Sequence, residues 1–243
     1  LFNSFAAALC FIGLKTTYSL WIRSVLLGCA VLGSVLSVSS GAIISILLQM
    51  GIIAWAYIFH NLHRKWLILL ITILAAYVSV DLASNRTPLQ VFMSYATFSA
   101  HSAYWRSTIF DWGLLNIQMQ PFFGLGFKDW LRPEWMHTPS IDNFWLLIAM
   151  RFGVPAFSFL IFGYGWALRR ISQRNFDHLP AIKAHRQAWI ICVIGLGFAL
   201  TTVHIWGAIY SLTFFIVGSG MWLVTTGTKG AVTTPAKVGP IIS

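Results

Sequence analysis

Long apolar runs are the feature that most constrains how this chain can fold. Residues 42–59 and 66–80 contain no charged side chain. A helix needs about 20 mostly apolar residues to cross the hydrocarbon of a bilayer, because every backbone polar group must be satisfied inside the span. We expect spans near residues 1–14, 21–38, 41–59, 66–82, 143–168, 187–206 and 208–225. The pattern therefore predicts an all-α fold, a polytopic transmembrane helix bundle.

The composition agrees with a membrane protein. Of the 243 residues, 58% are hydrophobic and 9% are charged, whereas about a quarter of a soluble domain is charged. Topology and anionic lipid headgroups account for the formal net charge of +10, so a nucleic-acid partner is not needed. The three cysteines lie in expected spans without metal-ligand spacing, and we expect neither a metal nor a cofactor.

The chain opens on Leu1 inside an apolar run, without a charged segment ahead of a cleavage site. That pattern favours a cut helix over a signal peptide. We therefore expect residues 1–243 to be a single membrane domain, and an N-terminally truncated fragment of a longer protein.

Lys and Arg indicate the orientation, because short loops rich in them stay in the cytoplasm. With residues 60–65 inside, the alternation of spans puts most of the 16 basic residues on the cytoplasmic side, together with the tail 227–243. The long connection 83–142 then faces outward. It holds four of the six acidic residues, Asp111, Asp129, Glu134 and Asp142. A loop of this length is usually functional, so we expect binding or chemistry there.

Two short segments organise this loop. Residues 103–118 predict a helix with Trp105, Ile109, Trp112 and Leu115 at helical spacing. Such a helix either lies in the membrane interface or forms a lid on the other spans, and both interpretations are open. In 120–130, Pro121 ends the helix, and Gly124 and Gly126 permit a tight turn.

The end of the loop predicts a helix start, with Ser140, Asp142 and Asn143 as candidate caps. Arg151 follows, just before the apolar run 152–168. Either Arg151 lies in the membrane, or a short initial helix leaves it at the interface. Gly153 and Pro155 make a bend plausible at this point.

These segments together carry a family resemblance. The order Arg86, "AYWRSTIFDWG", "PFFGLGFKDW" and "DNFWLLIAMRFGVPA" resembles the O-antigen polymerase and ligase superfamily, and "LSVSSGAIIS" (36–45) is similar to its Ser-rich segment, with Ser40 where an Arg is common. The resemblance covers roughly 30–225 and is closest to polymerases of bacterial exopolysaccharide clusters. Ligases of this superfamily typically carry His directly before the Asn, where this chain has Asp142.

The resemblance implies a metal-independent glycosyltransferase of the bacterial inner membrane, with loop 83–142 as its periplasmic catalytic loop. It would polymerise oligosaccharide repeats into a surface polysaccharide, exopolysaccharide or O-antigen, by moving glycan from a polyprenyl (undecaprenyl) diphosphate carrier to a sugar hydroxyl. Its partners would be that lipid-linked oligosaccharide, membrane lipids and, as a further candidate, a chain-length regulator.

Candidate site residues follow from that chemistry. A departing diphosphate needs positive charge, which arginine supplies through planar, bidentate donors; the candidates are Arg86, Arg106, Arg151 and Arg132. The acceptor hydroxyl needs a base, for which Asp142 and His137 are candidates. Trp130, Trp135 and Trp145 are candidates for stacking on sugars.

Each residue has a plainer alternative: interfacial anchors for Arg86 and Arg106, a helix cap for Asp142, a solvated loop histidine for His137 and an aromatic belt for the tryptophans.

Alternative functions also stay open. An O-antigen ligase would transfer glycan to a lipid A core. A transporter or flippase for lipid-linked sugars would use the same arginines as a phosphate site, although we find no internal repeat and few charges within the spans. A non-catalytic assembly subunit explains the topology but not the charged loop.

Overall fold

The computed structural model describes residues 6–37, 39–85, 91, 100–203, 205 and 207–226. Its described part is helical and contains no strand, as expected for an all-α bundle. The elements are the π-helix η1 (Leu9–Gly13), α2 (Leu20–Leu36), α3 (Ser40–Ile58), α4 (Lys65–Ala83), α6 (Ala100–Met119), α7 (Phe144–Ser172), α8 (Pro180–Ala199), α9 (Gly207–Ser219) and α10 (Trp222–Thr225). Arg86 and the tail 227–243 lie outside the described residues.

Four helical segments in the described part of the chain are long and apolar enough to cross a membrane. They are α3, α4, α7 and the segment Gly207–Thr225 that contains α9 and α10, and all four were expected. The expected span 21–38 is α2, an apolar helix of 17 residues. The expected span 187–206 differs from α8, which starts at Pro180 and ends at Ala199, because proline is favoured in the first helical turn.

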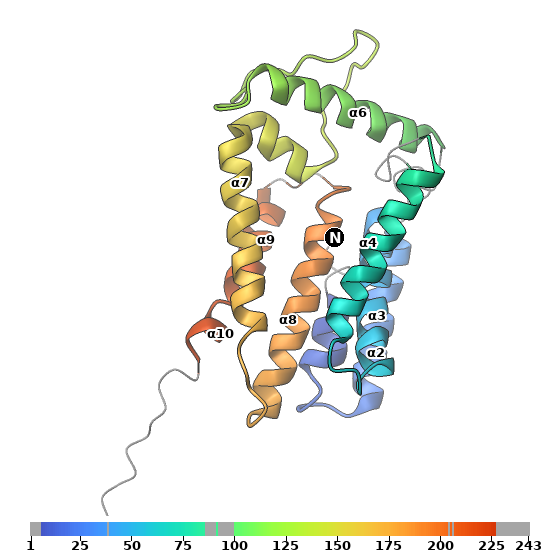
Figure 1. Cartoon of the computed structure of the whole chain (residues 1–243), viewed down its shortest axis with the longest axis vertical. Coiled ribbons are helices and arrows are strands. Elements are labelled where there is room, and N and C mark those ends of the chain that lie inside the picture. The colour runs from blue at the N-terminus through green and yellow to red at the C-terminus, as the bar shows by residue number, and fades with distance from the viewer. Residues whose placement is uncertain are drawn as a thin grey trace, which may run out of the picture.

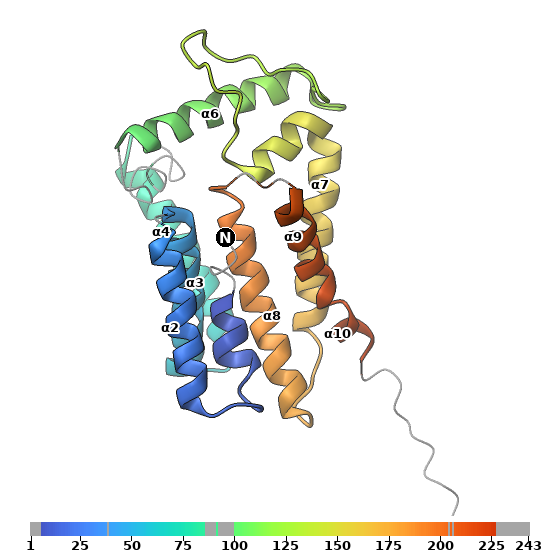
Figure 2. The same ribbon diagram turned by 180° about the vertical axis from the view of Figure 1, so that it is seen from behind.

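The long helices run roughly upright in Figure 1, and α6 with the α6–α7 connection lies across their upper end. That end, called the polar end below, carries Asp111, Asp129, Glu134 and Asp142. The turns before α2, between α3 and α4 and between α7 and α8 lie at the opposite end (Figures 1 and 2). These turns carry the basic residues that indicated the cytoplasmic side, including Lys15, Arg64 and Arg174. The basic turns therefore lie at the opposite end of the bundle from α6.

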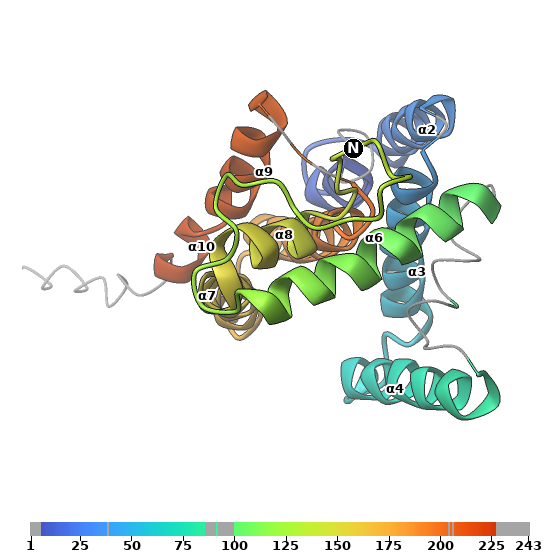
Figure 3. The same ribbon diagram turned by 90° about the horizontal axis from the view of Figure 1, so that it is seen from above.

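The centre of the bundle is a close contact of α8 with α3 and η1. Ser45 Oγ donates to the Gly195 carbonyl at 2.8 Å, and Gln49 Oε1 accepts from the Ala8 backbone N–H at 3.2 Å. A Cβ on Gly195 would lie 2.5 Å from Gln49 Nε2, so any larger residue here would force the Gln49 side chain to move. Small residues and interhelical hydrogen bonds are the usual means by which membrane helices pack. By contrast, α4 stands apart in Figure 3 and has no buried residue.

Helix α6 crosses the polar end of the bundle, over the ends of the other helices (Figures 1 and 3). Ile109 is buried and Trp105 and Trp112 are half-buried, as a packed face requires, whereas Leu115 is exposed. Ile109 belongs to an apolar cluster with Trp130, Met136, Ile141, Leu146 and Met150, from the following connection and from α7. Of the two interpretations of this segment, the packing favours a lid on the other helices.

Helix α7 is broken at Gly153, where φ is 82° and ψ is 169°. In an unbroken helix the Met150 and Arg151 carbonyls would accept from residues 154 and 155, but Pro155 has no N–H. The Met150 carbonyl instead accepts from Leu125 N–H at 2.8 Å, and the Arg151 carbonyl accepts from Gly126 N–H at 2.9 Å. Val154 N–H donates to the Pro121 carbonyl at 2.7 Å. The turn 121–126 thus replaces the helix's own hydrogen bonds.

Glycine is required on both sides of this contact. Gly124 and Gly153 have φ of 65° and 82°, a region that side chains with a Cβ rarely adopt. A Cβ on Gly124 would lie 2.5 Å from the Arg151 carbonyl carbon, and one on Gly153 would lie 2.2 Å from the Phe122 carbonyl oxygen. The bend expected from Gly153 and Pro155 is confirmed. The turn 121–126, which contains Gly124, packs against it.

We predict that Gly153→Ala lowers the free energy of unfolding by ~2 to 3 kcal/mol, because the substitution combines backbone strain with a steric clash. The matched control is Gly163→Ala, since Gly163 lies on the same helix with no atom within 4 Å of an added Cβ. Alanine at such a helical position is neutral or stabilises by up to about 1 kcal/mol. Equilibrium unfolding of the two variants in mixed micelles measures the difference. Equal stabilities would contradict the role given to the glycine contact.

Candidate functional site

The connection between α6 and α7 is tied to α6 by one buried asparagine. Asn116 Nδ2 donates to the Leu131 carbonyl at 2.8 Å, and its Oδ1 accepts from Leu131 N–H at 2.9 Å. These two hydrogen bonds imitate one step of a β-ladder. Asn116 Nδ2 also donates to the Trp112 carbonyl at 2.8 Å, so each polar atom of the side-chain amide has a partner. The residues that follow Leu131 are therefore held in a defined place beside α6.

Arg132 and Asp129 close this connection into a loop. Arg132 Nη1 lies 2.6 Å from Asp129 Oδ1, and Arg132 Nε donates to the Met136 carbonyl at 3.0 Å. The guanidinium also lies over the Trp130 ring, 5.8 Å from its centroid. The hydrogen bond from Arg132 lowers the pKa of the Asp129 carboxyl, with smaller contributions from Trp130 N–H and the charge of Arg151. Arg132 is therefore engaged in holding the loop.

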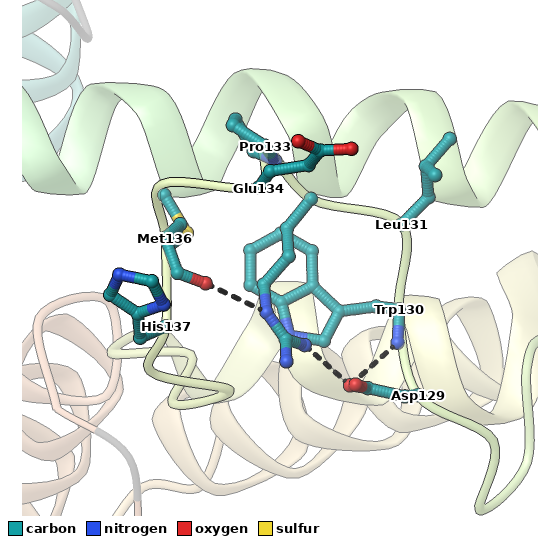
Figure 4. Close-up of a pocket in the computed structure, with 8 residues that line it drawn as sticks. Asp129, Trp130, Leu131, Pro133, Glu134, Met136 and His137 are labelled. Atoms are coloured by element: carbon teal, nitrogen blue, oxygen red, sulfur yellow. Dashed lines mark hydrogen bonds and ion pairs between the residues drawn. The ribbon is translucent and has the colours of Figure 1, made fainter.

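The loop surrounds an open cavity of about 390 Å³. Figure 4 shows Asp129, Trp130, Met136 and His137 around it, with the hydrogen bonds that close the loop. The full lining is Asp129, Trp130, Leu131, Arg132, Pro133, Glu134, Met136 and His137. The structure thus brings three of the predicted site residues, Trp130, Arg132 and His137, to one cavity. The lining does not include Arg106, Arg151 or Asp142.

The three candidate tryptophans have different environments. Trp130 is 7% exposed, and its indole N–H donates to the Pro139 carbonyl at 3.1 Å. Trp145 is half-buried between α7 and α8, and its indole N–H donates to the Gly197 carbonyl at 2.9 Å. Trp135 is 48% exposed. Packing accounts for Trp130 and Trp145, so Trp135 is the tryptophan of the three that offers an open ring.

Arg151 lies at the end of the short initial segment of α7, two residues before the break at Gly153. Its Nη1 donates to the Gly126 carbonyl at 3.1 Å, and the side chain is half-buried. The same turn therefore holds both the backbone and the side chain of Arg151. Of the two interpretations of this residue, the break favours a short initial helix with Arg151 at the boundary of the span.

The cap of α7 is Asn143, whose Oδ1 accepts from Leu146 N–H at 3.1 Å. Of the three candidate caps, Asn143 has the hydrogen bond that defines a cap. Asp142 is exposed, and its Oδ1 accepts from Ser140 Oγ at 3.2 Å. The Asp142 carboxylate is therefore held beside the helix start with its other oxygen available to a ligand.

Arg106 of α6 and Asp142 lie near each other, since their chain neighbours Trp105 and Ile141 pack in one apolar cluster. Burial lowers the pKa of the half-buried Arg106 guanidinium, and the charge of Asp142 opposes that shift. An arginine stays charged at neutral pH even when partly buried. The structure therefore places a candidate diphosphate ligand on α6 near a candidate base that precedes α7.

Two pairs of the predicted residues lie around one apolar cluster. Arg132 and His137 lie at the cavity, whereas Arg106 and Asp142 lie where α6 meets α7. The cluster of Ile109, Trp130, Met136, Ile141, Leu146 and Met150 joins the elements that carry both groups. Asn116 and Asp129 were not among the candidates, because neither the hydrogen bonds of Asn116 to Leu131, 15 positions on, nor the ion pair of Asp129 with Arg132 shows in a periodic pattern.

The apolar helices define a multi-pass membrane protein, and the candidate site lies at the end of the bundle that α6 crosses. The sequence model of the O-antigen ligase family matches residues 24–161, more than half of the chain. The chain belongs to this family, as its motifs predicted. No match was found among curated proteins.

The matched region contains all of the candidate site residues and extends from α2 through the break in α7. Family membership makes the chain a membrane protein of glycan transfer, of the O-antigen ligase or polymerase kind, that acts on lipid-linked oligosaccharides. The turn 121–126 and the break in α7, which belong to two separate sequence motifs, are hydrogen-bonded neighbours in the fold.

We predict that Asn143→Ala destabilises the protein by ~1 kcal/mol, since it removes the cap of α7. Asp142→Ala is the matched control and should change the free energy of unfolding by less than about 0.5 kcal/mol, as expected for an exposed side chain that caps nothing. Both variants are compared by equilibrium unfolding in mixed micelles. A larger loss from Asp142→Ala than from Asn143→Ala would assign the capping role to Asp142.

Proposed function

We propose that this chain is a polysaccharide polymerase of the O-antigen ligase family. Its substrate would be an oligosaccharide repeat on a polyprenyl diphosphate carrier, and its acceptor a sugar hydroxyl of a second carrier-linked repeat. The motif supports a polymerase over a ligase, because Asp142 stands before Asn143 where ligases typically carry histidine. The product would be a surface polysaccharide.

The single observation that carries the proposal is the packing of Trp105 of α6 with Ile141 in one apolar cluster, which brings their chain neighbours Arg106 and Asp142 near each other. In the proposed reaction the acceptor oxygen attacks the anomeric carbon, and the bond from that carbon to the diphosphate oxygen breaks. The electron pair leaves on the diphosphate, where Arg106 and Arg151 neutralise it. The hydroxyl proton passes to the Asp142 carboxylate as general base.

His137 and Arg132 have a different place in this proposal. Both line the cavity of about 390 Å³ beside the loop 129–137. We assign this cavity to the sugar part of one substrate, with His137 as a hydrogen-bonding group or as a second candidate base. Arg132 holds the loop through Asp129, and Arg86 remains a proposed diphosphate ligand outside the described residues.

The proposed orientation places α6 and the connection 120–142 on the periplasmic face of the bacterial inner membrane. Its support is the separation of charge along the bundle, since the basic turns lie at the opposite end from α6. A carrier-linked diphosphate at the outer surface would then lie level with Arg106 and Arg151. We propose that these arginines supply the positive charge, so that transfer needs no metal.

The test is reconstitution of the full-length protein with the polyprenyl-diphosphate-linked repeat of its own cell, in a chelator and without nucleotide. A ladder of lengthened products on a gel is the expected result. Transfer to lipid A core without a ladder would establish a ligase instead. Movement of the substrate across sealed vesicles without product would establish a transporter, and a ladder that requires added metal would overturn metal independence.

We predict that Asp142→Asn lowers the rate of ladder formation by about 10² to 10⁴, the usual contribution of a general base. Arg106→Ala should lower it by about 10² to 10³, because a positive charge at the leaving group is lost. Arg106→Lys should recover only part of the rate, since lysine keeps the charge but loses the bidentate fork.

The control is Arg169→Ala, which removes an exposed arginine at the opposite end of α7 and should leave the rate within about twofold, as is usual for surface substitutions. Each variant is reconstituted at equal protein content. Normal polymer from Arg106→Ala or Asp142→Asn would remove that residue from the site.

A further inference from the structure

Two exposed aromatic rings lie together at the polar end of the molecule. Tyr104 of α6 is 59% exposed and Trp135 of the α6–α7 connection is 48% exposed. Their ring centroids are 6.3 Å apart and their planes are 24° from parallel. The two residues are 31 positions apart in the sequence, so this nearly parallel pair is a product of the tertiary fold.

A second aromatic contact fixes the position of this pair. Trp105 meets Trp135 edge to face, with centroids 5.4 Å apart and planes at 70°. The Trp105 indole N–H donates to His101 Nε2 at 2.7 Å, one helical turn earlier on α6. Trp105 is thereby held from both sides, and it supports the Trp135 ring. Side chains that are ordered before a ligand arrives cost less binding entropy.

The pair differs from the other aromatic groups of the same loop. The indole N–H of Trp130 is used by the Pro139 carbonyl and its ring lies in the apolar cluster. Tyr104 and Trp135 instead leave half of their surface open, on a helix and a loop that both lie at the end of the bundle. Part of the α6–α7 connection rises beyond α6, on the side away from the spanning helices (Figures 1 and 2).

The chemistry of the pair suits a sugar ring. A pyranose has an apolar face of C–H groups, which carry partial positive charge, and a rim of hydroxyl groups. The face of an aromatic ring carries partial negative charge and attracts such C–H groups. Charged and hydrogen-bonding side chains flank Trp135 and Tyr104 closely in sequence, among them Glu134, His137 and Arg106. Glu134 and His137 line the neighbouring cavity.

We propose that Tyr104 and Trp135 form a stacking subsite for a sugar residue of the oligosaccharide, with Trp105 and His101 as positioning residues. This inference rests on the proposed function insofar as the ligand is the glycan of a lipid-linked repeat. The subsite would bind the oligosaccharide at a distance from the reacting anomeric carbon. It would thereby position the acceptor or donor repeat relative to Arg106 and Asp142. It would contribute binding rather than chemistry.

The test measures binding without turnover. The full-length protein in nanodiscs is titrated calorimetrically with the oligosaccharide repeat of its own cell, cut from the carrier, so that no transfer can occur. Trp135→Ala and Tyr104→Ala should each weaken binding about tenfold, the change that ~1.4 kcal/mol of lost contact produces. Trp135→Phe keeps an aromatic face and should stay within about threefold of the parent Kd.

The matched controls remove an exposed ring elsewhere. Phe127, in the same connection, is 95% exposed, and Trp21, at the start of α2, is 75% exposed. Phe127→Ala and Trp21→Ala should bind the oligosaccharide like the parent protein. Unchanged binding by Trp135→Ala, equal weakening by Phe127→Ala, or no binding by the parent protein would overturn the subsite.

The transfer assay separates this inference from the proposed function. With the carrier-linked repeat as substrate, Trp135→Ala should raise KM about tenfold and leave kcat within about twofold, because uniform binding is lost. A parent protein that makes no ladder but binds the free oligosaccharide would refute the polymerase and retain the subsite. A ladder with an unchanged KM for Trp135→Ala would retain the polymerase and refute the subsite.

Discussion

The break in α7 is the constraint on which the polar end of the molecule depends. In a low-dielectric region each unsatisfied backbone group costs several kcal/mol, so a spanning helix can be interrupted only where other groups replace its hydrogen bonds. Leu125, Gly126 and Pro121 supply those groups through the turn 121–126. The turn therefore packs against α7. Helix α6, which leads into the turn, crosses the end of the bundle (Figure 3).

That docking also positions the charges. The Gly126 carbonyl accepts from Arg151, Asn116 ties Leu131 to α6, and Arg132 closes the loop onto Asp129. Every one of these contacts joins the connection 120–142 either to itself or to a neighbouring helix. A loop with no regular secondary structure is thus given the rigidity that a binding or catalytic site needs. The spanning helices serve as the support, held by Ser45 and Gln49 against α8 and η1.

The apolar cluster beneath this site explains how Arg106 and Asp142 keep a fixed position relative to Arg132 and His137. Ile109, Trp130 and Ile141 come from α6, the loop and the approach to α7, and they pack into one cluster. Arg106 and Asp142 flank it where α6 meets α7, and the cavity of Arg132 and His137 borders it through Trp130 and Met136. Aromatic side chains contribute most of the packing area in such a cluster, which is why Trp130 is better explained as a core residue.

The sequence by itself determined the fold class, the four strongly apolar spans, the bend at Gly153 and the family, because hydrophobic length, proline, glycine and motif order are local properties of the chain. Only the tertiary structure decided the surroundings of each candidate residue. It made Asn143 the cap and left the Asp142 carboxylate beside Arg106, buried Trp130, and stacked Trp135 on Tyr104. Those outcomes depend on contacts between distant segments, which no periodicity within a segment encodes.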